Sequence, residues 1–311
     1  MKQAANKAQG VPFSLPRSKY VGDENNHLYI IPPSYWGGND DEAWYIQDAI
    51  DFVKSDEEYT KWDFGNNEKL DFLPTQHLIL PVNKQNVLDA GIVKPEDEDL
   101  ILDEIVFTIK KDHLLKSEMM LLDMLANFDW RRPICFTQVY VLDNLGLLDY
   151  LQFDGFSYRL VPIRTPYYSS WDIGRIDTEL TYDLMMNKFR YGNLADEDVL
   201  VDYFTSYNMA ASKTREGFAR LAKALINEGD KDRARKVLEK GLEVYPIEKI
   251  RYSDANTIPF IESYYLLGDN QMGDKMLRDY ANHLMEHLNY YLRFPAHQQE
   301  LIVSEIANKE N

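Results

Sequence analysis

The sequence predicts a mixed fold, with an α/β region of the mixed α+β type first and an all-α region of helical hairpins after it. Three observations favour this fold class. Short strand-like apolar runs alternate with helical patterns over 1–165. The C-terminal third of the chain shows helical periodicity alone. Within it, a short segment that contains a Gly-Asp pair occurs twice, at a spacing that is typical of repeated helical hairpins.

Length and composition describe a folded chain. Its 311 residues give a prior of two domains at about 150 residues each. Aromatic residues make up 13% of the chain, which is too many for global disorder. The net charge of −17 would repel a phosphate backbone, so we expect no nucleic-acid partner. The longest uncharged run, 72–83, is too short to cross a bilayer.

Charge is spread unevenly, which places the expected domain boundary. From Lys213 onward the basic and acidic side chains nearly balance, so almost all of the net charge of −17 lies before Lys213. We therefore expect the boundary between Arg164 and Lys213. The expected division is an α/β region over 1–165, an aromatic connector over 166–193, and a helical region over 194–311. Free linkers lack bulky aromatic residues, so the connector should be packed.

Short runs of the first region have the pattern of strands, with apolar residues in a row or in alternation. They are His27–Ile31, Leu78–Val82, Glu104–Ile109, Ile134–Thr137 and Phe156–Ile163. Pro32 ends the first run, and Pro81 indicates that the second lies at a sheet edge or ends there. Strands that alternate with helices favour an α/β layer, whose strand order the sequence leaves open.

Three segments of the first region show helical spacing. We expect Asp40 or Asp41 to cap the first helix and Ser117 to cap the second. Their apolar faces, and that of the third helix, are formed by Ala43, Ile46, Ile50 and Val53; by Leu121, Leu122, Leu125 and Phe128; and by Val141, Leu142, Leu145 and Leu148.

Cys135 is the only cysteine, so the chain has no intrachain disulfide. Its apolar neighbours Ile134 and Phe136 predict a small buried hydrophobe rather than a reactive thiol. No apolar stretch of a signal peptide follows Met1. Two alternatives remain open at this point: the protein is cytosolic, or the chain begins partway through a longer one.

The recurring segment predicts two helical hairpins. Residues 229–238 resemble residues 268–277. The first hairpin matches the tetratricopeptide pattern at these positions: Phe218, Leu221, Ala222, Leu225, Ala234, Leu238, Gly241 and Pro246. The second is weaker, since Gly273 replaces the small alanine and Tyr280 stands where a small residue is expected. Such hairpins form a stacked surface that either binds a partner or only packs.

No phosphate-binding glycine loop, zinc-protease motif or hydrolase nucleophile motif is present. We therefore expect no cofactor. His283 and His287 could share a metal, but an exposed pair is the simpler interpretation. The acidic run 96–99 is best explained as a solvated loop. The arginines at 131 and 132 are expected to satisfy helix C-terminal carbonyls rather than to clamp an anion.

One segment combines aromatic rings with carboxylates and amides. Rings stack on the apolar face of a sugar, and carboxylates accept hydrogen bonds from its hydroxyls. Helix capping and core packing explain the same residues, so both interpretations stay open. The candidate glycan or ligand contacts are Tyr35, Trp36, Asn39, Asp40, Asp41 and Trp44.

Several runs resemble a known family. They are Leu114–Ser117, Asn127–Trp130, Arg132–Phe136, Leu145–Leu147, Tyr150–Leu151, Gly155, Tyr158–Pro162, Phe189–Asn193 and Phe218–Ala222. Together they resemble the C-terminal soluble part of a bacterial multi-pass membrane family, protein of unknown function family 2723 (DUF2723). That family is similar to the GT-C type glycosyltransferases, including protein O-mannosyltransferases.

The resemblance implies a setting for the chain. A transmembrane bundle would precede Met1 and tether the chain at the extracytoplasmic (periplasmic) face of a bacterial inner membrane. The catalytic acid of GT-C enzymes lies near their first membrane helices, so no catalytic residue is carried over to this sequence. The partners would be the chain's own membrane bundle and an acceptor protein or glycan.

Three functions are therefore compared. The first is a non-catalytic extracytoplasmic portion of a membrane-anchored glycosyltransferase-like protein, acting in docking or in acceptor or glycan positioning. The second is a protein-interaction module with a peptide groove between Phe218 and Tyr291. The third is a self-contained carbohydrate-active enzyme with a deep pocket near Trp36 to Trp44, in which two carboxylates would have pKa values pushed apart.

Overall fold

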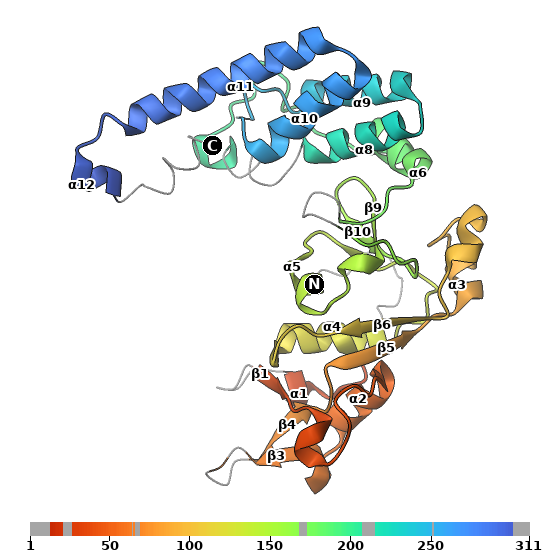
Figure 1. Ribbon diagram of the computed structural model, residues 1–311. Coiled ribbons are helices and arrows are strands. Elements are labelled where there is room, and N and C mark those ends of the chain that lie inside the picture. The colour runs from red at the N-terminus through yellow and green to blue at the C-terminus, as the bar shows by residue number, and fades with distance from the viewer. Residues whose placement is uncertain are drawn as a thin grey trace. The chain divides into compact units, whose positions relative to one another are not determined.

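The computed structural model describes residues 13–20, 27–63, 65, 69–167, 173–206, 215–250 and 252–300. The chain divides into two compact units (Figure 1). Residues 1–153 and 157–175 form the first, and residues 154–156 and 176–311 form the second. Among the described residues, the sheets lie in the first unit and the long helices in the second, which confirms the mixed fold class. The chain start at Met1 lies outside the described residues.

Three small sheets form the frame of the first unit. Their orders are β3-β4-β1-β7, β2-β5-β6 and β8-β10-β9. The pairs β1–β4 and β2–β5 are parallel, and the other pairs are antiparallel. The strands are β1 His27–Ile30, β2 Trp44–Tyr45, β3 Lys61–Asp63, β4 Lys69–Leu73, β5 His77–Pro81, β6 Glu104–Thr108, β7 His113–Leu115, β8 Cys135–Phe136, β9 Leu151–Phe153 and β10 Tyr158–Leu160.

The predicted strands agree with this frame in position and differ in length. Ile105, Phe107 and Ile109 all face the core, as the alternation predicted. Pro81 is the last residue of β5, a central strand, so it marks a strand end and not an edge. The run 156–163 is a strand only over Tyr158–Leu160, where it pairs with β8 and β9.

Five helices of the first unit are described: α1 Arg17–Tyr20, α2 Ile46–Lys54, α3 Lys84–Asp89, α4 Lys116–Ala126 and α5 Tyr140–Asn144. The predicted caps of α2 were wrong. Trp44 and Tyr45 pair with β5, so the helix begins only at Ile46, and Ala43 lies before it. Asp40 instead accepts a hydrogen bond from the amide of Ser34 at 2.7 Å. Tertiary pairing has overridden a plausible local cap.

The two later helices also differ from the prediction at their ends. Leu115, not Ser117, is the N-cap of α4, because the carboxylate of Glu118 accepts from the Leu115 amide at 2.8 Å. Helix α5 stops at Asn144, before Gly146. At Gly146 φ is +74°, and a Cβ atom would lie 2.3 Å from the carbonyl oxygen of Thr108. Only glycine fits there, so Leu148 lies outside the helix.

Cys135 is exposed, which corrects the prediction of a buried thiol. It lies on β8, where successive side chains point to opposite faces. Ile134 takes the buried face with 9% of its side chain exposed, so Cys135 faces outward.

The prediction that the arginines satisfy helix C-terminal carbonyls was also wrong for Arg131, which pairs with Asp129 at 3.4 Å. The side chain of Asn127 is the group that donates to the helix carbonyl of Asp123, at 2.8 Å.

A buried carboxylate attaches the N-terminal segment to α4. Asp123 is fully buried and accepts hydrogen bonds from the amides of Ser14 and Leu15 at 2.9 and 3.0 Å. It also accepts from the Ser14 hydroxyl at 2.6 Å and from the side-chain amide of Asn127 at 3.0 Å. These donors compensate the desolvation of the carboxylate, so Asp123 fixes the start of the segment at Ser14 and Leu15. The end of the segment is held separately, by the ion pairs of Lys19 with Asp56 and Asp71 at 2.8 and 2.9 Å.

The second unit consists of helices in its described part: α6 Thr178–Asp183, α8 Glu216–Asn227, α9 Lys231–Val244, α10 Asp254–Leu267, α11 Asn270–Tyr291 and α12 Ala296–Gln299. A π-helical turn, Leu184–Lys188, continues α6. Helices α8 and α9 form one hairpin, α10 and α11 form the next, and α8 also packs against α10.

The recurring segment forms equivalent turns in both hairpins. Gly229 and Gly268 adopt the left-handed conformation, with φ of +87° and +81°. The amides of Asp230 and Asp269 donate back to Leu225 and Tyr264 at 2.9 Å each, as in a Schellman motif. Both aspartates then cap the next helix. The repeated Gly-Asp pair therefore ends one helix and begins the next.

The centre of the second unit depends on close helix packing. Phe218, on α8, is fully buried. A Cβ atom added at Gly241, on α9, would lie 2.9 Å from Phe218 and 2.8 Å from Phe260 of α10. The apolar positions of the first hairpin pattern are all buried, and α9 ends at Val244, before Pro246.

The second unit also buries the guanidinium of Arg215. This group donates a hydrogen bond to the carbonyl of Ile250 at 3.0 Å, and burial lowers the pKa of Arg215 to about 10.

Acid should destabilise the two hairpin turns. The pKa of Asp230 is lowered by hydrogen bonds from the amide and guanidinium of Arg233, and that of Asp269 by Arg235 and the Met272 amide. A carboxyl with a lowered folded pKa contributes stability that is present above its unfolded pKa and is lost as the pH falls through the folded one. We expect the melting temperature of the helices to decrease once the pH is below about 4.

Circular dichroism melts between neutral and strongly acidic pH measure this response. The variant D230N/D269N keeps competent caps, since asparagine caps as well as aspartate, but it loses the titrating groups. Its acid response should be smaller than that of the unaltered chain. An identical response in both proteins would show that these turns do not cause the acid sensitivity.

Candidate binding groove

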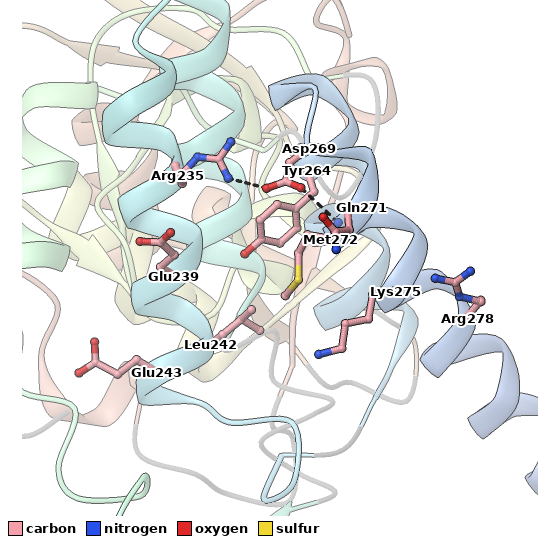
Figure 2. Close-up of a pocket in the computed structure, with 10 residues that line it drawn as sticks. All are labelled: Arg235, Glu239, Leu242, Glu243, Tyr264, Asp269, Gln271, Met272, Lys275 and Arg278. Carbon is pink, nitrogen blue, oxygen red and sulfur yellow. Dashed lines mark hydrogen bonds and ion pairs between the residues drawn. The ribbon is translucent and has the colours of Figure 1, made fainter.

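A groove runs between α9 and α11, with α10 beneath it. Its volume is about 800 Å³, within the range of ligand sites. Figure 2 shows the lining side chains on the two walls and the floor. They are Arg235, Glu239, Leu242 and Glu243 of α9; Tyr264 of α10; Asp269 at the cap of α11; and Gln271, Met272, Lys275 and Arg278 of α11.

Helical periodicity places these residues on the walls. Arg235, Glu239 and Glu243 recur at every fourth position along α9 and so share one face. Gln271, Lys275 and Arg278 follow helical spacing on α11 in the same way. The two walls are joined at one end, where the guanidinium of Arg235 donates to the carboxylate of Asp269 at 2.5 Å. This bridge raises the pKa of Arg235 and lowers that of Asp269, so both remain charged at neutral pH.

The floor is apolar and contains one hydroxyl. Tyr264 is 3% exposed, and Leu242 and Met272 are half-buried beside it. Burial, with a smaller effect from Glu239, raises the pKa of Tyr264 to about 12. The phenol therefore stays neutral and can donate a hydrogen bond. Figure 2 shows its hydroxyl directed toward the α9 wall.

The exposed charges on the two walls are opposite in sign. Glu239 and Glu243 stand on α9, and Lys275 and Arg278 stand on α11. Glu243 contacts Lys240 of its own helix at 2.9 Å. Within the described part of the chain, Glu239, Lys275 and Arg278 form no salt bridge. Their charges are therefore available to an occupant of the groove.

The predicted glycan contacts lie in the first unit, and the structure brings their aromatic members together. The rings of Trp36 and Trp44 meet edge to face at 6.0 Å, and Trp36 also stacks on Phe52 at 6.5 Å. Tyr35 points to a different neighbour, Trp62, at 6.1 Å. Trp36 is 42% exposed and Tyr35 is 72% exposed. The result is an aromatic surface centred on Phe52.

The polar members of that set shape a turn. Asp40 accepts from the Ser34 amide, which lowers the pKa of Asp40 and keeps it ionised. The side-chain oxygen of Asn39 accepts from the amide of Asp41 at 3.1 Å. Turn formation therefore already uses one oxygen of Asp40 and the oxygen of Asn39, while the rings remain accessible.

Comparison with known protein families decides the relationship of the chain. The model of the family described as TMEM260-associated domain 2 matches residues 1–180, more than half of the sequence. The chain belongs to the TMEM260-associated domain 2 family. Comparisons with curated proteins and with solved structures gave no significant match. This family is distinct from DUF2723, and the relation to DUF2723 stays a prediction.

The TMEM260-associated domain match includes the aromatic surface and leaves the groove outside it. Among the described helices, none is both long and apolar enough to span a bilayer. Sequence reasoning missed Phe52, Tyr59 and Trp62 as members of the aromatic surface. The ring of Phe52 meets that of Tyr59, and the rings of Phe52 and Trp62 both meet Phe72 of β4. No local sequence pattern signals these contacts.

Two other predicted features of this TMEM260-associated domain protein, the histidine pair and the acidic run, are less exposed than predicted. The rings of His283 and His287 lie 4.3 Å apart on α11 and are half-buried rather than exposed. No cluster of three or more metal-ligating side chains occurs among the described residues. The acidic run 96–99 is not wholly solvated, since Asp97 accepts from Arg175 at 2.5 Å and both side chains are 18% exposed.

Proposed function

We propose that this chain is a polypeptide-binding accessory portion of a larger, membrane-anchored glycosyltransferase-like protein. In this proposal it is non-catalytic and lies on the extracytoplasmic side of a bacterial inner membrane. Its groove between α9 and α11 holds an acceptor polypeptide or docks another part of the same protein.

The groove is the observation that carries the proposal. Its apolar floor, buried hydroxyl and charged walls combine the contacts that a peptide needs: apolar burial, a hydrogen-bond donor and charged rims. The two hairpins share their turn chemistry at 229–230 and 268–269, and Gly241 and Gly273 pack closely against aromatic rings. These features support a tetratricopeptide-like character, which belongs to the proposal.

The larger context rests on two lines of support. The family description names a domain that accompanies TMEM260. The runs that resemble DUF2723 extend from Leu114 to Ala222, so they cross from the matched family segment into the helical unit. Both favour a chain that works beside other parts of a larger protein.

Peptide binding by the full chain tests the proposal. A random peptide library is selected on the immobilised full-length chain, and the best peptide is titrated by calorimetry. The variant L242A/M272A removes two half-buried floor side chains and should weaken binding at least tenfold, because each buried side chain contributes about 1 kcal/mol or more and tenfold corresponds to about 1.4 kcal/mol. The matched control is Leu277→Ala, which lies on α11 but outside the groove.

Equal affinity in the floor variant and the control would place the binding site elsewhere. Failure to select any peptide would overturn the proposed function. Circular dichroism of both variants shows whether the helices are retained.

The aromatic surface favours glycan positioning as a second role. Trp36 presents 42% of its side chain while it packs on Trp44 and Phe52, so its ring is held in place for stacking on a sugar. A glycan array should identify ligands whose binding falls at least tenfold in Trp36→Ala. Tyr140→Ala, an exposed tyrosine of the same unit, should have no effect. Equal losses in both variants would contradict this role.

A further inference from the structure

We propose that the groove selects a polypeptide segment by its charge pattern. The segment has an apolar ridge, a basic flank that faces α9 and an acidic flank that faces α11. This inference rests on the proposed function and makes it more specific, since it names the chemistry of the occupant. It follows from the arrangement of charges on the two walls.

Each wall presents two exposed charges of one sign. Glu239 and Glu243 are one helical turn apart on α9, and Lys275 and Arg278 are about one turn apart on α11. Figure 2 shows the acidic pair and the basic pair on opposite sides of Tyr264. A segment of uniform charge would be attracted by one wall and repelled by the other. A segment with one flank of each sign gains from both walls.

Salt bridges between the two walls would neutralise the charges that give this preference, and only one such bridge is present among the described residues. The cross-wall bridge between Arg235 and Asp269 lies at the end where α9 and α11 begin. Beyond that bridge, the described residues form no salt bridge from one wall to the other. The occupant therefore supplies counter-charges to Glu239, Lys275 and Arg278, whereas Glu243 already contacts Lys240 of its own helix. The apolar ridge of the occupant lies over Leu242 and Met272.

The floor requires an apolar ridge between the two flanks. Leu242 and Met272 are half-buried, and Tyr264 leaves only 3% of its side chain exposed. Burial of apolar surface supplies affinity, whereas exposed charges mainly supply specificity and orientation. An amphipathic helix meets this requirement, because two helical walls with an apolar floor accept the ridge of a third helix.

Four synthetic helical peptides with the same apolar face test the inference. Their flanks carry Lys and Glu, Lys and Lys, Glu and Glu, or Gln and Gln. Each is titrated against the full chain at low and high salt. We expect the Lys/Glu peptide to bind at least tenfold more tightly than the others, with the difference reduced at high salt by screening.

Reversal of single walls should change the preference. E239K/E243K makes both walls basic and should favour the Glu/Glu peptide, whereas K275E/R278E makes both walls acidic and should favour the Lys/Lys peptide. Reversal of all four residues should restore the Lys/Glu preference. All four residues are exposed, so the fold should be retained. The control K223E/E262K reverses an exposed pair on α8 and α10, outside the groove.

The outcomes separate this inference from the proposed function. Switched preferences support both. If peptides bind but their ranking is unchanged when a wall is reversed, the charge pattern is overturned and the proposed function stands. If neither these peptides nor the random library binds the chain, both are overturned.

Discussion

Phe218→Ala is expected to lower the free energy of unfolding of the helical unit by about 4 kcal/mol, the range for truncation of a buried phenylalanine. Phe218 is fully buried and lies against Gly241, and its ring meets those of Tyr191 and Tyr245 at 5.6 and 6.2 Å. No neighbouring side chain can fill the space without leaving its own contacts. The helices α8, α9 and α10 should separate at lower denaturant than in the unaltered chain.

Two signals distinguish the units in this experiment. All five tryptophans lie before residue 176, so tryptophan fluorescence reports the first unit, while far-ultraviolet circular dichroism is dominated by the helices. Phe218→Ala should shift the dichroism transition much more than the fluorescence transition. Phe204→Ala, at an exposed phenylalanine of the same unit, should shift neither. A shift of less than about 1 kcal/mol for Phe218→Ala would contradict the packing described for these helices, because truncation of a buried phenylalanine costs more than that.

Asp123→Ala is expected to destabilise the first unit by about 3 kcal/mol, because buried donors left without an acceptor cost about 1–3 kcal/mol. The substitution removes the acceptor for the amides of Ser14 and Leu15 and for the Ser14 hydroxyl. Hydrogen bonds to a charged group are also stronger than neutral ones. The chain around Ser14 and Leu15 should then detach from α4 before the rest of the unit unfolds, while Lys116 still donates to the Lys19 carbonyl at 2.9 Å.

Denaturant unfolding followed by tryptophan fluorescence measures this loss, and hydrogen exchange locates it. Amides near Ser14 should exchange faster in the variant. Asp129→Ala, at a carboxylate with 60% of its side chain exposed, should be close to neutral. Unchanged exchange near Ser14 would mean that other contacts hold the segment.

Some of this architecture could be predicted because local chemistry determines it. The Gly-Asp pair at 229–230 and 268–269 has one structural role in each copy, so its recurrence predicted both turns. The alternation in Glu104–Thr108 predicted a strand with Ile105 and Phe107 buried. In these segments the local pattern and the tertiary contacts favour the same conformation.

Other features depended on distant contacts. Because Trp44 and Tyr45 pair with β5, α2 begins only at Ile46, several residues after the predicted caps. Cys135 has apolar neighbours, yet the strand turns it outward. The groove itself has no sequence signature, because Glu239 and Lys275 occupy ordinary exposed helix positions. They share one site only because α9 and α11 lie on the same side of α10.

The central claim is that the groove between α9 and α11 binds a polypeptide. Amide chemical shifts of the isotope-labelled full chain, recorded while a selected peptide is added, test it most directly. The account predicts that the largest changes occur along 239–243 and 271–278 and that L242A/M272A greatly reduces them. Large changes confined to α8, α12 or the first unit, with the groove amides unaffected, would contradict it.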